Sequence, residues 1–450
     1  MNRLLIANRG EIACRIIKAA KSTGLPTVAV FSEADRDLPH AAMADMAVYV
    51  GPANAQESYL NTENIIKAAI ENGCTMVHPG YGFLSENAAF AQRCADAGLI
   101  FVGPAADHID LMGDKQNARD AAIAAGVPVL PGTGRLPQTD DDIVSASKGI
   151  GYPMLVKAVA GGGGHGMQRI DSADKLLSVV KRIRDFAARV FGDAGVYLER
   201  CLTSAHHVEV QVFGFGTQGA VHLFERDCSL QRRHQKVIEE APAPNVSDEA
   251  RNRMTKAALS LANSIGYAGA GTVEYLYDPT TEKFFFLEMN TRIQVEHPVT
   301  ETITGVDLVA LQLTFAMSPD AAPLLRQHDI KCSGAAIEAR IYAENPEKRF
   351  LPSPGMIEQM VLPEMPRVRY DTGYINGNEV TIHYDPMIMK VIAQGETRED
   401  ARKNLIAALR SMKIAGLTTN IPFLIGLLEN DSFKNASFDI NTIDLPSHNK

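Results

Sequence analysis

Short apolar strands alternate with amphipathic helices along the first hundred residues of the chain, and this pattern limits the possible folds more than any other feature. We predict strands at residues 3–8, 27–31, 47–50, 76–78 and 100–102, and helices at 11–22, 62–72 and 86–97. Such alternation indicates an α/β fold with an open, mainly parallel sheet. Because no Gly-x-Gly-x-x-Gly sequence follows the first strand, a dinucleotide-binding site is not supported.

The chain is too long for one hydrophobic core, so we expect two or three domains. It has 450 residues, of which 46% are hydrophobic. The segment Pro131-Gly-Thr-Gly134 is typical of a linker, and we place a domain boundary near it. Beyond it, strands at 154–158 and 196–199 and helices at 140–149 and 172–191 predict a small α/β unit. Residues 203–330 carry long strands, and residues 331–445 begin with a strand at 335–342 and end with a helix at 398–412.

Composition and charge exclude several classes of function. The net charge of −9, the absence of Trp and an aromatic content of 6% offer neither the basic surface nor the stacking residues that bind nucleic acid. The apolar runs fall far short of the ~18–20 residues of a membrane span, so we expect neither a signal peptide nor a span. Six dispersed cysteines without a Cys-x-x-Cys pair indicate reduced thiols in a cytoplasmic compartment.

A run of glycines, Gly161-Gly-Gly-Gly-His165-Gly166-Met167, directly follows a predicted strand that ends near Lys157. These glycines offer no side chains to a core and lose much backbone entropy on folding. A flexible linker is one interpretation, but linkers seldom lie inside one small folded unit. We therefore predict a flap whose backbone N–H groups bind phosphate while Lys157 supplies a cation. Since the P-loop motif is absent, a different nucleotide-binding fold is indicated.

Two acidic residues face each other in a predicted hairpin formed by residues 272–277 and 284–290. If its turn centres near Thr281, Glu274 lies opposite Glu288, and alternation puts Asn290 on the Glu288 face. Facing carboxylates repel each other unless a cation joins them. Exposure to solvent or pairing with Arg is the alternative interpretation. Hard oxygen ligands beside a phosphate site favour one or two Mg²⁺ ions.

The same strand continues into a dense polar run at residues 290–298. Alternation predicts that Arg292, Gln294 and Glu296 lie on one side, which supplies a cation for a small anion and a carboxylate that can act as a base. The alternative is an ordinary charged loop.

A second polar run extends from Glu225 to Lys236, and by itself it is equally compatible with a solvated basic stretch. The side chains of His207, Glu209 and Arg340, taken singly, are compatible with ordinary buried polar residues. Cys228 has no neighbouring base pattern, so we interpret it as structural.

Seven segments, taken together, resemble biotin carboxylase, the ATP-grasp subunit or domain of biotin-dependent carboxylases such as acetyl-CoA, acyl-CoA or pyruvate carboxylase. They include Leu-Ile-Ala-Asn-Arg-Gly-Glu-Ile-Ala, His-Pro-Gly-Tyr-Gly-Phe-Leu-Ser-Glu-Asn and Tyr-Asp-Pro-Met-Ile, and they lie at residues 5–13, 78–87, 113–115, 161–167, 225–236, 288–301 and 384–388. The resemblance implies an α/β ATP-grasp fold. Its parts would be an N-terminal open-sheet (pre-ATP-grasp) domain, an ATP-grasp domain with a lid, and a C-terminal biotin carboxylase domain, at residues 1–113, 114–330 (lid about 132–202) and 331–445.

The resemblance also implies roles for individual residues. The residues that contact ATP would be Lys115, Lys157, Gly163, Gly164, Glu199, Leu202, His207, Gln231 and His234. One or two Mg²⁺ ions, or Mn²⁺, would be held by Glu274, Glu288 and Asn290. Bicarbonate would bind Arg292, Gln294 and Val295, with Glu296 as its base. Lys236 would lie beside the transferred phosphate, and Arg340 would stabilise carboxyphosphate and the biotin enolate.

The implied reaction is the ATP- and bicarbonate-dependent N-carboxylation of biotin through carboxyphosphate, the first half-reaction of a biotin-dependent carboxylase. The chain contains no Ala/Val-Met-Lys-Met biotinyl motif. We therefore expect biotin to be presented by a carrier protein or domain. A carboxyltransferase subunit is a further expected partner and a homodimer the expected assembly. The chain would be either a free-standing subunit or one domain of a longer chain.

Two other functions are kept as alternatives, another ATP-grasp ligase and a non-catalytic nucleotide-binding subunit. The run from Arg292 to Glu296, together with Arg340, favours the biotin enzyme over the first. His165 stands in the glycine run where the family usually has Arg, and imidazole titrates near neutral pH. We therefore expect the KM for ATP to rise between about pH 6 and 8, and a flat KM would contradict this hypothesis.

Overall fold

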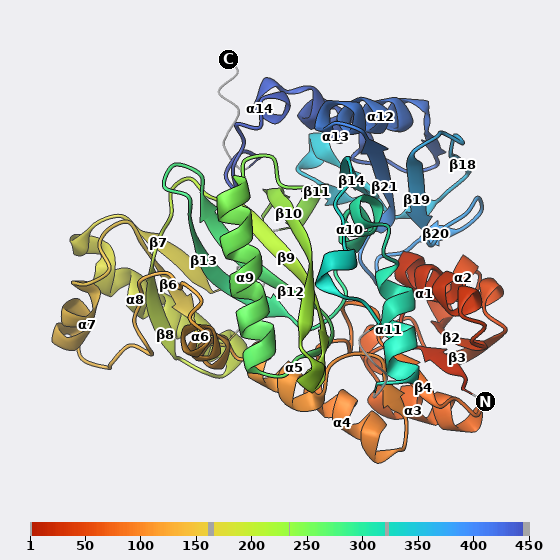
Figure 1. The fold of residues 1–450 in the computed structure, drawn as a ribbon, viewed down its shortest axis with the longest axis horizontal. Helices are drawn as coiled ribbons and strands as arrows, with labels where there is room; N and C mark the ends of the chain where they lie inside the picture. The colour runs from red at the N-terminus through yellow and green to blue at the C-terminus, as the bar shows by residue number, and fades with distance from the viewer. Residues whose placement is uncertain (1, 161–165, 234, 320–323, 444–450) are drawn as a thin grey trace.

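The computed structural model describes residues 2–160, 166–233, 235–319 and 324–443. Within this part of the chain, the strands form a five-stranded, a three-stranded and an eight-stranded sheet, with three further two-stranded pairs. The eight-stranded sheet extends from the centre of the molecule to the right, where its last strands belong to the C-terminal part; the three-stranded sheet lies at the left and the N-terminal part at the lower right (Figure 1).

The N-terminal sheet is parallel throughout, with the strand order β3-β2-β1-β4-β5. Its strands read as short continuous apolar runs because both faces of the sheet are covered: Leu4 and Ile6 pack into one core and Leu5 into another. The arrangement confirms the predicted α/β fold. The strands are β1 Leu4–Ile6, β2 Thr27–Ser32, β3 Met46–Gly51, β4 Met76–His78 and β5 Ile100–Phe101, and the helices are α1 Gly10–Ser22, α2 Pro39–Met43, α3 Thr62–Glu71, α4 Ala88–Asp96 and α5 Ala106–Gly113.

The small α/β unit predicted beyond residue 134 is present as an antiparallel sheet with the order β7-β6-β8. The segment predicted as a linker runs beside this sheet, since Gly132 bridges Glu199 and the Thr133 amide donates to the Leu198 carbonyl at 2.8 Å. Glycine permits this approach because a Cβ at residue 132 would lie 2.7 Å from the same carbonyl oxygen. The elements are β6 Met154–Ala158, β7 Met167–Ile170, β8 Val196–Arg200, α7 Asp140–Ser147 and α8 Leu176–Phe191, whereas the preceding helix α6 Lys115–Ala124 packs against the core of the central sheet. We call this unit the lid.

The central sheet is antiparallel with the order β13-β12-β9-β10-β11-β14-β21-β19, and it continues across residue 330, where we placed a domain boundary. Its strands are β9 His206–Phe215, β10 Ala220–Arg232, β11 Gln235–Ala241, β12 Ala268–Asp278, β13 Lys283–Asn290, β14 Ala335–Tyr342, β19 Val368–Thr372 and β21 Met387–Gly395. The helices that follow or cover it are α9 Asp248–Ser264, α10 His297–Thr304, α11 Leu308–Met317 and α12 Arg398–Ser411.

The prediction that the C-terminal part ends with the helix at 398–412 is wrong. The chain continues after α12 through β22 Lys413–Ala415, α13 Ile421–Glu429 and α14 Asp431–Lys434. Helix α13 is apolar on most of its positions, so it lacks the amphipathic period that reveals a helix in a sequence. The remaining short strands are β15 Glu344–Asn345, β16 Leu351–Pro352, β17 Gly355–Met356, β18 Gln359–Val361 and β20 Glu379–Val380.

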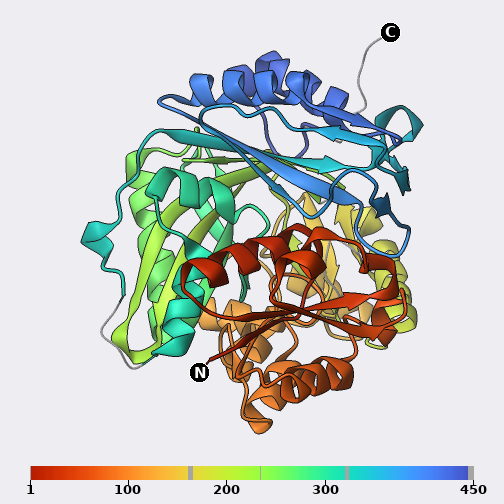
Figure 2. The ribbon, with the colours of Figure 1, turned by 90° about the vertical axis from the view of Figure 1, so that its right-hand side faces the viewer.

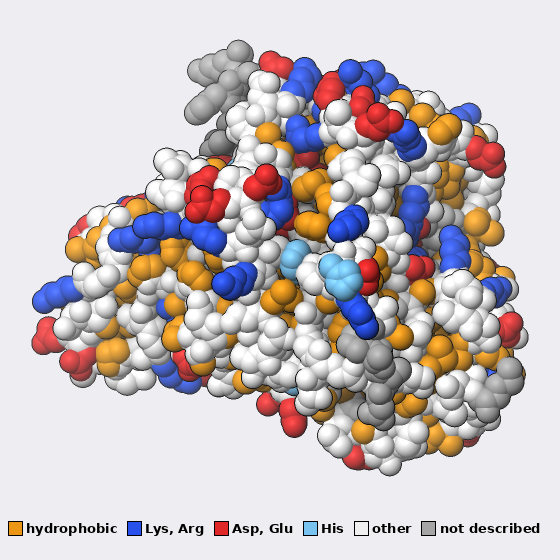
Figure 3. Space-filling view, in the orientation of Figure 1, with side chains coloured by type: hydrophobic (Ala, Val, Ile, Leu, Met, Phe, Trp, Pro, Cys, Tyr) orange, Lys and Arg blue, Asp and Glu red, His pale blue; other side chains and the backbone are white. Residues whose placement is uncertain are grey.

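The N-terminal and C-terminal parts are stacked against each other although they are far apart in sequence (Figure 2). Polar contacts join them: the Tyr384 hydroxyl donates to Ser32 Oγ at 2.7 Å, and Arg9 donates to the Tyr374 hydroxyl at 3.1 Å. On the face drawn in Figure 3, basic and acidic side chains are interspersed over the described residues. Every helix in the described ranges is too short or too polar to cross a lipid bilayer.

Candidate active site

A cavity of about 1010 Å³ lies where the N-terminal part, the lid and the central sheet meet. Thirteen of the residues predicted for the site line it: Lys115, Lys157, Glu199, His207, Gln231, Lys236, Glu274, Glu288, Asn290, Arg292, Gln294, Val295 and Arg340. Glu296 lies buried beside it, and Leu202 is half-buried and does not line it. Gly163, Gly164, His165 and His234 lie outside the described residues.

The lid side of the cavity carries cations around one carboxylate. Lys157 on β6 lies 2.5 Å from Glu199 Oε2 on β8, and Arg119 on α6 lies 3.3 Å from Oε1 of the same residue. Burial lowers the pKa of Lys115, and the nearby Glu288 carboxylate opposes that shift. Sequence reasoning missed Arg119, which carries no motif of its own. This side offers a set of cations for a polyphosphate.

The β12–β13 hairpin has the predicted register, with Glu274 directly opposite Glu288 and a bulge just after Glu274. Asn290 donates its amide N–H to Glu274 Oε1 at 2.8 Å, and His207 Nε2 lies 2.7 Å from Oε2. Glu288 faces the open cavity. Desolvation at the cavity wall and then the Glu274 charge raise the pKa of Glu288, because the two facing carboxylates repel each other. These oxygen donors fit a divalent cation, which would relieve the repulsion.

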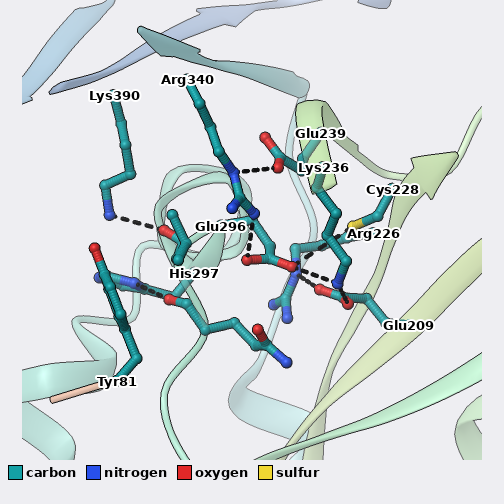
Figure 4. Close-up of polar contacts among 12 residues, drawn as sticks. Tyr81, Glu209, Arg226, Cys228, Lys236, Glu239, Glu296, His297, Arg340 and Lys390 are labelled. Atoms are coloured by element: carbon teal, nitrogen blue, oxygen red, sulfur yellow. Dashed lines mark hydrogen bonds and ion pairs between the residues drawn. The ribbon is translucent and has the colours of Figure 1, made fainter. Parts of the chain in front are cut away.

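Lys236 on β11 joins three acidic residues from three different elements, two of which, Glu209 and Glu296, are labelled in Figure 4. Its ammonium nitrogen lies 2.6 Å from Glu209, 3.0 Å from Glu274 and 2.7 Å from Glu296. Burial opposes ionisation, but Lys236 and then Arg340 hold the pKa of Glu296 well below its usual value. For Glu274, Lys236 and His207 likewise overcome burial and lower the pKa. Glu274 and Glu296 are therefore ionised at neutral pH.

The polar run from Glu225 to Lys236 is not a solvated basic stretch, so that alternative is wrong. Its described residues form the buried end of β10, an exposed turn at Arg233 and the start of β11. Arg226 is fully buried and pairs with Glu209 at 2.5 Å, while it also donates to Thr300 Oγ1 at 2.9 Å. The ladder β9–β10–β11 brings these groups together, and a single sequence does not show such pairing.

The segment after Asn290 is not an extended strand, so the predicted alternation is wrong for residues 292–296. Strand β13 ends at Asn290, and a turn then leads into α10. Arg292 and Gln294 line the cavity, whereas Glu296 is fully buried at the start of α10. Arg292 lies 2.7 Å from Glu86, and it donates to Gln294 Oε1 and Asn290 Oδ1 at 3.0 Å each.

Arg340 on β14 completes the charged cluster. Its guanidinium lies 2.6 Å from Glu239 and 3.0 Å from Glu296 (Figure 4). Burial raises the pKa of Glu239 to about 7, although Arg340 acts in the opposite direction. Burial also raises the pKa of Cys228, whose sulfur lies 3.9 Å from Glu296, so this thiol is protonated at neutral pH. Glu239 is a further neighbour of the site that sequence reasoning missed.

A small three-stranded unit faces a long antiparallel sheet across a cavity that has cations on one side and paired carboxylates on the other, and this arrangement defines an ATP-grasp enzyme. Family models match three successive segments: Biotin carboxylase, N-terminal domain, at 1–109; Carbamoyl-phosphate synthase L chain, ATP binding domain, at 114–321; and Biotin carboxylase C-terminal domain, at 338–445. Biotin carboxylase 1 and Biotin carboxylase 2 of Bacillus subtilis (strain 168) are 45% and 47% identical to this chain. The alignments cover 99% of this chain in both cases, and 98% and 99% of the relatives.

Solved structures agree with these matches. The biotin carboxylase–β,γ-ATP complex from Campylobacter jejuni has a TM-score of 0.94 and 40% identity, over 98% of each chain. The biotin carboxylase domain dimer of the Hydrogenobacter thermophilus 2-oxoglutarate carboxylase, in complex with MgADP, ADP and bicarbonate, has a TM-score of 0.92 and 40% identity. The alignment covers 98% of this chain and 97% of the Hydrogenobacter chain. The chain therefore belongs to the biotin carboxylase family of ATP-dependent ligases.

Proposed function

We propose that the chain uses ATP and bicarbonate to carboxylate biotin held on a carrier protein or domain, the first half-reaction of a biotin-dependent carboxylase. The observation that carries this proposal is Glu296, a buried carboxylate held between Lys236 and Arg340 directly beside the cavity. Because Glu296 is ionised, it is able to accept a proton from a small anion, and the cations Lys236 and Arg340 beside it suit stabilisation of the anions that follow. The ligands of the Campylobacter and Hydrogenobacter structures support the same substrates.

ATP would lie between the lid and the central sheet. Lys115 and Lys157 would bind its phosphates, with Glu199, His207 and Gln231 contributing further contacts. The resemblance to the family adds Gly163, Gly164, Leu202 and His234 to this set. Lys157 already pairs with Glu199, so phosphate binding would replace or share that ion pair. Closure of the lid would exclude water from the phosphoryl group.

Mg²⁺, or Mn²⁺ in its place, would be held by Glu274, Glu288 and Asn290. When bound there, the metal would neutralise charge on the phosphate oxygens during transfer. The residues of this chain position it through their own contacts. His207 and Lys236 fix the Glu274 carboxylate, while Glu288, on the facing strand, projects into the cavity.

Bicarbonate would bind Arg292, the Gln294 side chain and the backbone at Val295. Glu296 would accept the bicarbonate proton while a bicarbonate oxygen bonds to the γ-phosphorus and ADP leaves, which yields carboxyphosphate. Carboxyphosphate would then break into CO₂ and phosphate. Phosphate would take the N1 proton of biotin, and N1 would attack CO₂. Arg340 would stabilise the negative charge on carboxyphosphate and on the biotin enolate, and Lys236 would lie beside the transferred phosphate.

The assembly proposed for this chain is a homodimer that works with a biotin carrier and a carboxyltransferase. The dimeric Hydrogenobacter structure supports the first part. This chain is 47% identical to methylcrotonoyl-CoA carboxylase subunit alpha of Dictyostelium discoideum, and the alignment covers 64% of that relative. The similarity supports the proposal that this chain is part of a larger carboxylase. We also propose the division into residues 1–113, 114–330 and 331–445 as functional parts.

The test is bicarbonate-dependent ADP release by the purified chain with Mg-ATP, with and without free biotin. We expect biotin to stimulate turnover, and Glu296→Ala and Arg292→Ala to abolish it. Arg410→Ala, which removes an exposed surface pair with Glu429, is the matched control and should retain activity. ATP cleavage that ignores both bicarbonate and biotin would instead favour another ATP-grasp ligase.

A further inference from the structure

A fully buried lysine, Lys390 on β21, contacts the backbone of the loop that is proposed to bind bicarbonate. Its ammonium nitrogen donates to the Val295 carbonyl at 2.7 Å and lies 3.1 Å from the Glu11 carboxylate on α1. Its side chain has no exposed surface. Because a buried ammonium is costly unless it is paired and hydrogen-bonded, its position is defined by these two partners.

The loop is held from two adjacent strands. Arg340 on β14 lies directly opposite Lys390 on β21 in the antiparallel register, so both side chains extend from the same face of the sheet. Arg340 binds the side chain of Glu296, and Lys390 binds the backbone of the residue before it. Figure 4 shows the two cations side by side, with the loop between them and Tyr81.

The other partner of Lys390 belongs to the N-terminal part of the chain. Glu11 is almost fully buried, and it accepts a hydrogen bond from the Tyr81 hydroxyl on the oxygen that faces Lys390. The contact chain Tyr81–Glu11–Lys390–Val295 thus joins the N-terminal part of the chain to β21 and to the loop before α10, and Tyr81, Glu11 and Val295 line the cavity. Glu11 also compensates the lysine charge, which lets the ammonium point at a neutral carbonyl.

We infer that Lys390 is a positioning residue for bicarbonate: its hydrogen bond fixes the Val295 peptide, and so the anion-binding groups of Arg292, Gln294 and Val295 are preorganised. This inference rests on the proposed function and deepens it. Lys390 holds the carbonyl of the Val295–Glu296 peptide. If this peptide were free to rotate, the preceding Gln294–Val295 peptide, which carries the Val295 N–H, and the neighbouring side chains would adopt several orientations. Misplacement of binding groups on the 1 Å scale costs large factors in catalysis. Affinity for bicarbonate should suffer, while ATP binds elsewhere in the cavity.

The test separates this role from a role in folding. Lys390→Met removes the donor but leaves the Glu11 carboxylate buried and unpaired, so it should also lower stability. The double variant Lys390→Met/Glu11→Gln removes that unpaired charge as well. Met389→Ala removes a core side chain from the opposite face of the same strand, and it is the matched control for lost stability without loss of the hydrogen bond.

We expect both Lys390 variants to raise the KM for bicarbonate roughly tenfold, with the KM for ATP within about twofold of wild type. Lys390→Arg should recover part of the loss, and Met389→Ala should lower the melting temperature with an unchanged KM for bicarbonate. A wild-type KM for bicarbonate in the double variant would overturn the inference, as would equal increases in both KM values.

Amide hydrogen exchange of the peptide that covers residues 291–297 provides a readout that does not depend on turnover. Exchange should be faster in both Lys390 variants than in wild type and Met389→Ala, and unchanged exchange would overturn the inference. If wild type releases no ADP in response to bicarbonate, the proposed function fails. The exchange result then still decides whether Lys390 orders the loop.

Discussion

Replacement of Lys236 by Met tests the charged cluster most directly. The lysine ammonium lies within 3.0 Å of Glu209, Glu274 and Glu296. After its removal each acid would keep one basic neighbour within 3.0 Å, which is Arg226, His207 and Arg340 respectively. Removal of one partner from a buried ion pair costs about 3–5 kcal/mol. We expect a loss of that size in the free energy of unfolding at pH 8.

The loss should depend on pH, and its sign follows from the pKa directions. In wild type the pKa values of Glu274 and Glu296 lie below the usual one, so the stability they contribute is present above about pH 4.5. It is lost only as the pH falls through their folded values, so these groups contribute no slope between pH 6 and 8. Without Lys236, at least one buried carboxyl should have a pKa above its usual value.

The folded variant would then bind a proton that the unfolded chain does not bind. One such proton lowers the stability of the variant by about 1.4 kcal/mol per pH unit as the pH rises. The difference from wild type should therefore shrink by up to ~2.7 kcal/mol from pH 8 to pH 6. Because the chain has no Trp, unfolding in urea is best followed by circular dichroism at both pH values.

Lys67→Met is the matched control, since the Lys67 side chain is 70% exposed and should change stability little at either pH. A difference between Lys236→Met and wild type that stays constant from pH 6 to pH 8 would refute the reasoning on carboxylate pKa values. Full stability of Lys236→Met at pH 8 would refute the assignment of these three contacts as a buried ionic cluster.

Three further predictions concern separate parts of the site. Glu288→Gln should raise the Mg²⁺ concentration needed for half-maximal ADP release; an unchanged Mg²⁺ titration would contradict its role as a ligand. Arg226→Met should destabilise the fold by about 3–5 kcal/mol, because it leaves Glu209 buried with one cation fewer; unchanged unfolding in urea would argue against this. Glu240→Gln should flatten the fall in stability between pH 5 and 8. The protonated Glu240 side chain contributes about 3 kcal/mol of stability at pH values below the usual pKa of a glutamate. This contribution is lost as the pH rises through the folded pKa of Glu240, about 7. Equal slopes of stability against pH for the variant and the wild type would exclude this role of Glu240.

Much of the local structure could be predicted because it depends on neighbouring residues. The strands Met76–His78, Met154–Ala158 and Ala335–Tyr342 have the predicted bounds. The pairing of Glu274 with Glu288 was predictable for the same reason, since a short hairpin turn fixes its register. The family resemblance supplied the remaining site residues that no local pattern singled out, such as Gln231 and Lys115.

The groups that hold the site residues could not be predicted from local patterns. Arg226, Glu209 and Lys236 meet because β9, β10 and β11 are neighbours, and the sequence does not encode that register in any short motif. Lys390 is the clearest case, because its contact with Val295 joins residues 95 positions apart through the order of β14 and β21 in the sheet. Sequence periodicity also predicted that the strand continues past Asn290, but the backbone turns there and leads into α10.

Four pairs of facing residues in the ladder between β11 and β14 join the part of the chain before residue 330 to the part after it. Lys236 and Arg340 belong to these two strands, so the hydrogen-bonded ladder restrains the distance between their backbones. The three-stranded lid forms a separate sheet, so no strand ladder ties it to these two strands. A fragment that ended at residue 330 would also expose the edge of β11 to the solvent, and unpaired edges promote aggregation. Any dissection of this enzyme for expression should therefore keep β14 with the ATP-binding strands.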